Sequence, residues 1–222
     1  MKNIILIILL ISFFSCKTDN RKFSNEEKET KKSIDTVFFD DRGDTIKSQT
    51  YYLKNNYKLI IFPTLDKNEE VIKFRLINGK KDNTYVLVET FQANHRQYYE
   101  GVDLQNYFAL HANLGTHNHY FWLYEKETGK EIFTGIGRDF DLKNELVLYV
   151  DEDNNYNEFI YDVNTKLKTL VDIPKSFADK QECTRNDYFE KSSYIKRVTD
   201  KYYFIAFEDC PSTVEFKVKK SK

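Results

Sequence analysis

Residues 71–91 read VIKFRLINGKKDNTYVLVETF, and they carry the clearest structural pattern in this chain. Val71–Ile77 intersperses apolar side chains with charged ones at the period of a strand that buries one face. Asn78-Gly79 follows directly, and this dipeptide is the strongest short signal for a β-hairpin. Tyr85–Phe91 is rich in β-branched and aromatic residues and is the expected partner strand. This stretch therefore predicts an antiparallel pair of strands.

Short runs of the same kind alternate with turn residues from Ile34 almost to the C-terminus. Many short strands with frequent turns predict an antiparallel all-β meander, folded as a sandwich, a barrel, or a small or partial β-propeller. Residues 92–106 and 174–192 have weaker patterns, and each fits either a short helix or a long loop. The expected strands are Ile34–Phe39, Thr45–Leu53, Lys58–Phe62, Val71–Ile77, Tyr85–Phe91, Tyr107–Leu114, His117–Tyr124, Glu131–Thr134, Glu145–Tyr149, Phe159–Asp162, Leu167–Val171, Tyr194–Val198, Tyr202–Phe207 and Val214–Val218.

Two segments of the chain are similar to each other. FWLYEKETGKEIFTGI at 121–136 aligns with EFIYDVNTKLKTLVDI at 158–173, and both indicate a strand, an acidic turn containing Thr, and a second strand. The pattern resembles the outer hairpin of a β-propeller blade, and the spacing is close to the blade repeat of ~40 residues. A closed propeller needs at least four blades, which the chain barely allows.

The N-terminus has the pattern of an export signal. Lys2 provides a positive charge, and Ile4–Ile11 is an unbroken aliphatic run that Phe13 and Phe14 extend. A charged start followed by an apolar run is typical of a signal peptide. The run is too short to cross a membrane, because a spanning helix needs about 20 apolar residues.

The end of this run, Phe13-Phe14-Ser15-Cys16, resembles the lipobox of bacterial lipoproteins. A lipobox usually has Leu, a small residue, then Gly, Ala or Ser directly before Cys; Ser15 and Cys16 fit, whereas the two Phe depart from it. The resemblance implies that Cys16 carries a diacylglyceryl thioether and an acylated amine. Two or more acyl chains, at roughly 0.8 kcal/mol per buried CH₂, form a stable anchor. The alternative is a plain secretory signal from which Cys16 is lost.

The remaining chain divides into a tether and a folded domain. Residues 1–16 form the signal peptide, residues 17–33 are too charged to bury a face, and residues 34–222 form a single β-rich domain. The tether spans roughly 20–25 Å on average. Without Lys2 the chain has 33 basic and 35 acidic residues. This near balance gives no electrostatic reason to expect a nucleic-acid partner.

Two cysteines remain after Cys16, namely Cys183 and Cys210. In an exported protein such a pair indicates a disulfide. Closing this loop would stabilise the fold by ~3 kcal/mol in the chain-entropy model. The alternative is a metal or redox pair, but no CxxC spacing supports it.

Three histidines lie close together in the sequence. His117 and His119 point to the same face of a strand, so both could approach one metal ion. If Gly115-Thr116 is a two-residue turn, His111 lies on the opposite face and cannot be the third ligand. A longer loop would shift the register and could reverse this arrangement. The alternative is that these are ordinary exposed or half-buried histidines.

The chain contains no GxSxG, HExxH or Cys/His nucleophile pair, and we expect no cofactor. The sequence thus indicates a lipid-anchored protein of the cell envelope, on the periplasmic or outer-membrane face, that binds an unknown protein or glycan without catalysis. The alternative is a metal-dependent hydrolase that uses His117 and His119. Candidates for a binding platform, or equally for ordinary cross-strand pairs, are Tyr98, Tyr99, Tyr107, Tyr120, Trp122 and Tyr124.

Overall fold

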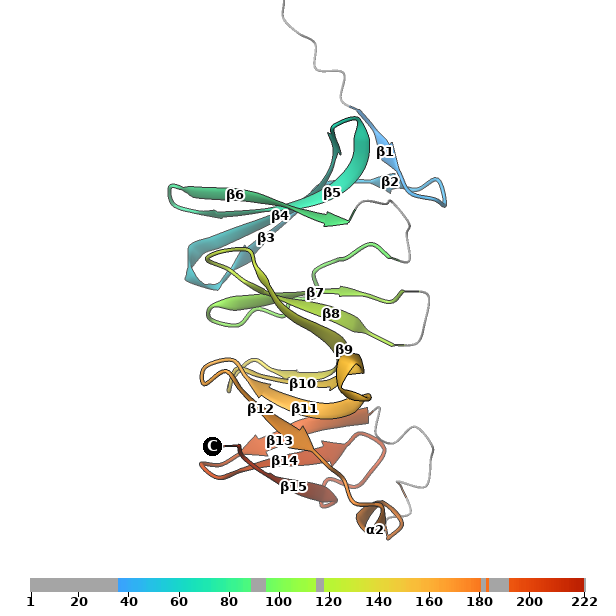
Figure 1. Ribbon diagram of the computed structural model, residues 1–222, viewed down its shortest axis with the longest axis vertical. Helices are drawn as coiled ribbons and strands as arrows, with labels where there is room; N and C mark the ends of the chain where they lie inside the picture. Colours follow the sequence, from blue (N-terminus) through green and yellow to red (C-terminus); the bar gives the residue numbers. More distant parts are fainter. Residues whose placement is uncertain (1–35, 89–94, 115–117, 181–182, 184–191, 222) are drawn as a thin grey trace, which may run out of the picture. The chain divides into compact units, whose positions relative to one another are not determined.

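The computed structural model describes residues 36–88, 95–114, 118–180, 183 and 192–221. Val37–Lys222 form one compact unit that is almost entirely antiparallel β-structure, which confirms the predicted fold class (Figure 1). No helix of the described residues is long and apolar enough to cross a membrane. The first strands are β1 (Phe38–Phe39), β2 (Thr45–Ile46), β3 (Gln49–Leu53), β4 (Tyr57–Asp66), β5 (Glu69–Asn78), β6 (Lys81–Val88), β7 (Tyr107–Ala112) and β8 (Tyr120–Glu125). They are followed by β9 (Glu131–Asp141), β10 (Leu146–Asp151), β11 (Asn157–Asp162), β12 (Leu167–Val171), β13 (Ser193–Val198), β14 (Tyr202–Phe207) and β15 (Glu215–Lys219), with short helical segments η1 (Lys54–Asn56), η2 (Glu152–Asn154) and α2 (Lys175–Ala178).

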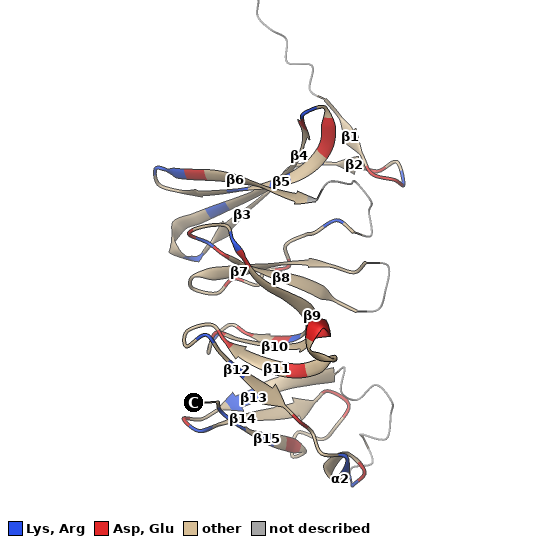
Figure 2. Ribbon diagram, in the orientation of Figure 1, with Lys and Arg blue, Asp and Glu red and all other residues tan. Residues whose placement is uncertain are grey.

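Strands that are consecutive in the chain are neighbours in the sheets. The sheets are β1-β2, β3-β4-β5-β6, β7 to β12 in order, and β13-β14-β15. Many of the charged residues lie at the tips and turns of the hairpins (Figure 2). In the hairpin of β5 and β6, Asn78 pairs with Lys81, so the two turn residues are Gly79 and Lys80. Gly79 has a φ of 59°, a conformation that glycine adopts without a steric penalty.

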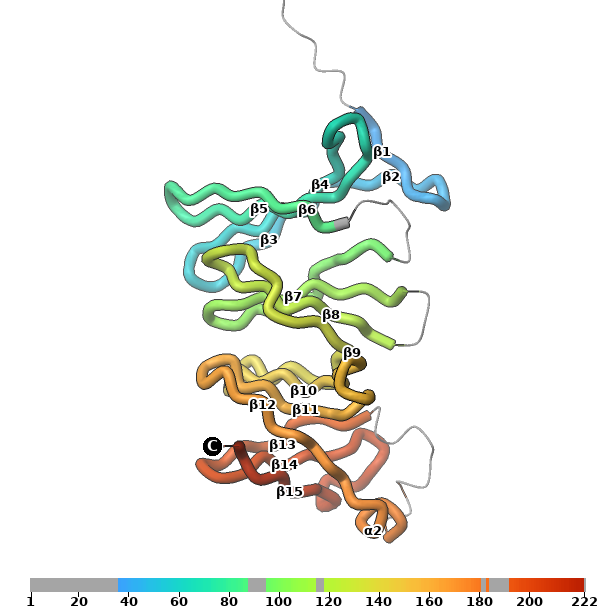
Figure 3. The backbone as a smooth tube through the Cα atoms, viewed as in Figure 1, coloured from blue at the N-terminus to red at the C-terminus, as the bar shows by residue number. Residues whose placement is uncertain are grey.

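The eleven-residue strand β9 joins the two halves of the six-stranded sheet. Its first part pairs with β8, with Gly135 opposite Phe121, and its last part pairs with β10, with Asp141 opposite Leu146. The backbone trace continues through β9 from one hairpin to the next (Figure 3). The ring centroids of Phe121 on β8 and Tyr149 on β10 are only 5.8 Å apart, so the sheet folds onto itself.

Three hydrophobic cores separate the stacked sheets. The first core joins β3–β6 to one face of β7 and β8, including Phe108 and Leu110. The middle core lies between the two halves of the six-stranded sheet and contains Tyr107 and Ala109 from the opposite face of β7. The last core joins β10–β12 to β13–β15. All six residues of β7 are buried because cores cover both of its faces, as expected from the two-residue period of a strand. The described part is sandwich-like, without a closed barrel.

Strand β4 extends past the point at which the sequence predicted its end. Pro63 lies inside the strand, opposite Ile72 of β5. Strand β3 pairs with β4 only up to Ile61, so β4 is an edge strand at Pro63. Proline is tolerated there because its missing N–H leaves no ladder bond unmade.

Candidate functional site

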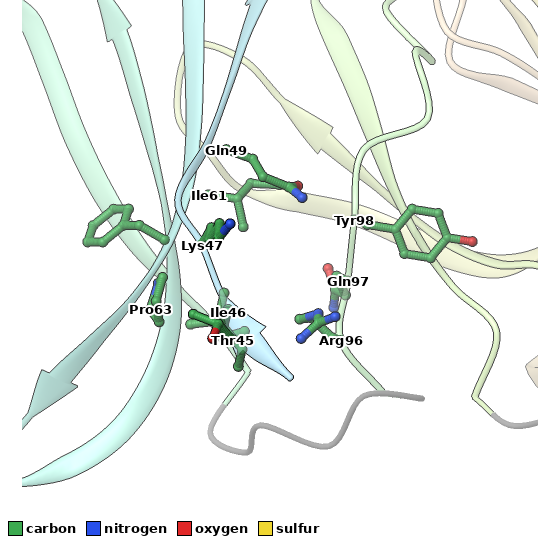
Figure 4. Close-up of a pocket in the computed structure, with 11 residues that line it drawn as sticks. Thr45, Ile46, Lys47, Gln49, Ile61, Pro63, Arg96, Gln97 and Tyr98 are labelled. Carbon is green, nitrogen blue, oxygen red and sulfur yellow. The ribbon is translucent and has the colours of Figure 1, made fainter. Parts of the chain in front are cut away.

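A cleft of about 410 Å³ opens at the edge of the first core, between β2–β5 and the segment of residues 96–98 (Figure 4). This volume lies within the range of roughly 300–1,000 Å³ that is typical of small-molecule sites. Figure 4 shows Lys47 and Gln49 on one side of the cleft, and Arg96 and Gln97 on the other.

The floor of the cleft is apolar because it is a wall of the first core. Ile46, Ile61 and Ile72 line the cleft, and their exposed fractions are 9%, 6% and 1%. They come from β2, β4 and β5, and each is also part of the first hydrophobic cluster. An apolar group placed in the cleft would therefore extend an existing core.

The opposite wall of the cleft is attached to β7 by backbone hydrogen bonds. The N–H of Tyr98 donates to the carbonyl of His111 at 2.9 Å, and the N–H of His111 donates back at 2.8 Å. These bonds attach Tyr98 to β7, and the neighbouring Arg96 and Gln97 line the cleft.

Both glutamines of the cleft have their side-chain oxygens occupied by tyrosine hydroxyls. Tyr51 Oη donates to Gln49 Oε1 at 2.6 Å, and Tyr124 Oη donates to Gln97 Oε1 at 3.2 Å. Burial raises the pKa of Tyr124, so its hydroxyl remains a donor. Gln97 is 6% exposed, and its Nε2 has no hydrogen-bond partner among the described residues. The amide groups therefore offer donors to the cleft.

The two cations of the cleft differ in their surroundings. Arg96 Nη1 lies 3.2 Å from Oδ2 of Asp40, a carboxylate whose side chain is 2% exposed. Burial would raise the pKa of Asp40, but hydrogen bonds from the backbone N–H groups of Asp44 and Arg42, together with Arg96, hold it below its usual value. Lys47 is exposed and forms no ion pair within the described part of the chain.

A second hollow, of about 420 Å³, differs in its charges. Its lining includes Arg138 as well as Glu158 and Asp172, so it brings both signs of charge together. Among the described residues that line the first cleft there is no acidic side chain. The first cleft is therefore the stronger candidate for a charged ligand.

Strands β7 and β8 pair in a register that leaves a longer connection between them than the two-residue turn Gly115-Thr116. His111 pairs with Phe121 and Ala112 pairs with Tyr120, so the arrangement expected for a two-residue turn is wrong. The register places His119 on the same side as His111. His119 is exposed, whereas the side chain of His111 is 5% exposed. His117 lies outside the described residues.

No group of three or more His, Cys, Asp or Glu side chains suited to a metal ion occurs in the described part of the chain. The Nε2 atom of His111 has no hydrogen-bond partner there, and its ring packs edge-on against Phe140 at 5.4 Å. Burial lowers the pKa of His111, and the nearby His119 lowers it further, while Glu100 acts in the opposite direction. Burial thus favours the neutral form of the His111 imidazole.

Cys183 and Cys210 are paired, with their Cα atoms 5.2 Å apart. Cys210 packs against the last core. Cys16 and the proposed tether lie outside the described residues, so lipidation remains a prediction.

The aromatic residues proposed as a platform are dispersed. Tyr107 is buried in the middle core, Tyr124 is buried in the first core and Trp122 packs against it. Tyr99 packs against Tyr51 with ring centroids 4.7 Å apart. Of the candidates, Tyr98 lines the cleft. Most of these rings thus serve as ordinary packing.

The polar residues of the cleft were not singled out from the sequence. Arg96 and Gln97 lie in a stretch with a weak pattern, and Lys47 stands between two short strands. Comparisons of the chain with protein-family models, with curated proteins and with solved structures find no match.

Proposed function

We propose that this chain is a lipid-anchored protein of the cell envelope whose β-domain binds a ligand or partner without catalysing a reaction. The cleft beside β2 and residues 96–98 carries the binding part of the proposal, because it combines an apolar floor with a rim of hydrogen-bond donors. A few convergent polar groups over an apolar surface are typical of ligand sites. The export signal ending at Cys16 is the basis for the anchor.

Site-specific photo-crosslinking tests the binding role. The photoreactive residue p-benzoylphenylalanine replaces Gln49 at the cleft or, as a control, Tyr52 on the outer face of β3, which is 82% exposed. The full chain is irradiated in its native host and its intact mass is measured. We expect an adduct at position 49 and none at position 52. No adduct at position 49, or equal adducts at both positions, would contradict binding in the cleft.

A hydrolase centred on His117 and His119 has less support. His119 is exposed, and no convergent set of ligands surrounds it within the described part of the chain. Zinc analysis of the purified full chain, with His119→Ala as the comparison, tests this alternative. Stoichiometric zinc that is lost in the variant would favour the hydrolase over the binding protein.

A further inference from the structure

We infer that the cleft binds an aliphatic carboxylate, that is, a single negative charge joined to a short apolar chain. This inference rests on the proposed binding function and names its ligand class. It follows from the charge balance, the donor pattern and the apolar floor of the cleft.

The charges of the cleft match a monoanion. Arg96 is compensated by the buried Asp40, whereas Lys47 forms no ion pair within the described part of the chain. One uncompensated cation therefore remains beside the cleft. A carboxylate would neutralise this charge, while a doubly charged phosphate monoester would bring one more negative charge than the site balances.

The hydrogen-bonding groups of the cleft also match a ligand that accepts hydrogen bonds and donates none. The oxygens of Gln49 and Gln97 already accept from Tyr51 and Tyr124, which leaves both amide nitrogens as donors. Arg96 has five N–H donors, and Asp40 engages Nη1. An ionised carboxylate has two oxygens that only accept, so it pairs with these groups without an unmatched donor of its own.

Gln97 contributes a donor that no described residue uses. Its side chain lies in the first core beside Tyr124, and its Nε2 is left without a partner among the described residues. This nitrogen is not enclosed by the protein, so it is open to a ligand in the cleft. A carboxylate oxygen in the cleft would satisfy this donor.

The floor supports the apolar part of the ligand. Ile46, Ile61 and Ile72 line the same cleft as these donors, and their side chains are almost fully buried. An aliphatic chain that covers this surface removes apolar area from water on both sides of the contact. Two sources share this chemistry: a free short-chain fatty acid, and the C-terminal carboxylate of a peptide that ends in an aliphatic residue.

Calorimetric titration of the full chain in lipid nanodiscs, with empty nanodiscs subtracted, tests the inference. The probes are hexanoate, hexan-1-ol, acetate, the tripeptide Ala-Leu-Ile and its C-terminal amide. We expect hexanoate, the free-acid tripeptide or both to bind at least roughly tenfold more tightly than the alcohol, acetate and the amide. The arm that binds identifies the source. The inference would be overturned if neither acid binds, or if the acid that binds does so no more tightly than its neutral counterpart, hexan-1-ol or the tripeptide amide.

Lys47→Gln removes the uncompensated charge, and Lys58→Gln is the matched control because Lys58 lies on the opposite face of β4 from Ile61. We expect Lys47→Gln to weaken binding of the acid by roughly fivefold or more and to leave the thermal unfolding midpoint unchanged, since Lys47 is exposed. Equal effects of the two variants would also overturn the inference. An adduct at position 49 without acid binding would refute the carboxylate but retain the binding function, whereas no adduct would refute both.

Discussion

Single buried polar residues in this protein differ in how their hydrogen-bonding groups are satisfied. Lys126 is 2% exposed, and its Nζ donates to the carbonyl of Leu104 at 2.6 Å and lies 2.6 Å from Oδ1 of Asp103. His111 is buried as well, but its Nε2 is left without a hydrogen-bond partner in the described part of the chain. Since protonation would place a charge in this enclosed, partly aromatic environment, His111 makes stability depend on pH.

We expect the free energy of unfolding to fall as the pH is lowered from about 7.5 to about 5. The unfolded imidazole takes up a proton near its ordinary pKa of 6.5, whereas burial keeps the pKa of folded His111 below that value. In this window the unfolded state binds more protons, so acidification favours unfolding by about 1.4 kcal/mol for each unit of pKa difference.

Urea unfolding of the wild type and of His111→Phe at both ends of this pH range measures the effect. The aromatic replacement retains a ring beside Phe140 but cannot titrate, so its pH dependence should be smaller. His119→Gln is the control, because His119 is exposed and its loss should leave most of the dependence intact. The same pH dependence in the wild type and His111→Phe would show that other groups are responsible.

At the scale of elements, β9 is the strand that allows one sheet to form two layers. Gly135 faces the middle core, where an added Cβ would lie 2.6 Å from Cδ2 of Tyr149 and 2.8 Å from the carbonyl oxygen of Val150. The backbone oxygen cannot move away as a side chain can. The absence of a side chain at Gly135 therefore lets β8 and β10 pack closely on either side of β9.

Gly135→Ala should destabilise the protein by about 1–3 kcal/mol, the usual cost of overpacking a core. Gly137→Ala is the matched control on the same strand, because its added Cβ would meet only side-chain atoms, the nearest being Cε2 of Phe140 at 3.2 Å. Denaturant unfolding of both variants measures the difference. Equal destabilisation by the two alanines would contradict a special role for Gly135.

The two similar segments, residues 121–136 and 158–173, form turns with the same geometry. The N–H of Gly129 donates to the carbonyl of Glu125 at 2.8 Å, and the N–H of Lys166 donates to that of Asp162 at 2.8 Å. Gly129 and Lys166 have φ values of 64° and 60°. The alignment of these segments therefore reflects a shared turn, which depends on residues close together in the chain.

At the scale of the whole molecule, the prediction with the widest consequences concerns Cys16. Labelled palmitate should be incorporated into the wild-type chain and not into Cys16→Ser, because acyl chains require the thiol and the amine of Cys16. Fractionation should find the wild type in the envelope. Cys183→Ser is the control, since it also replaces a cysteine but leaves Cys16 in place. Recovery of the wild-type chain from the cytosol with Met1 intact and no acyl group would contradict the export signal.

Much of the strand pattern follows from local sequence. The predicted strands Leu167–Val171 and Tyr202–Phe207 coincide with β12 and β14, because alternation and turn residues mark both ends. Strand β9 continues to Asp141, whereas the sequence predicted a strand that ends at Thr134. Gly135 and Gly137 weaken a strand pattern when the sequence is read without its neighbouring strands. The continuation of β9 depends on close packing against Tyr149.

The stacking of the sheets and the cleft depend on contacts between distant parts of the chain. Lys47 and Arg96 are almost fifty positions apart. They share a cleft because Tyr98 is bonded to β7 while Ile46 of β2 packs into the first core. Side-chain periodicity specifies which faces of a strand are apolar, but not which other sheet covers them. Local sequence is therefore sufficient for an antiparallel all-β chain, whereas the donor-lined cleft arises from long-range packing that no local pattern encodes.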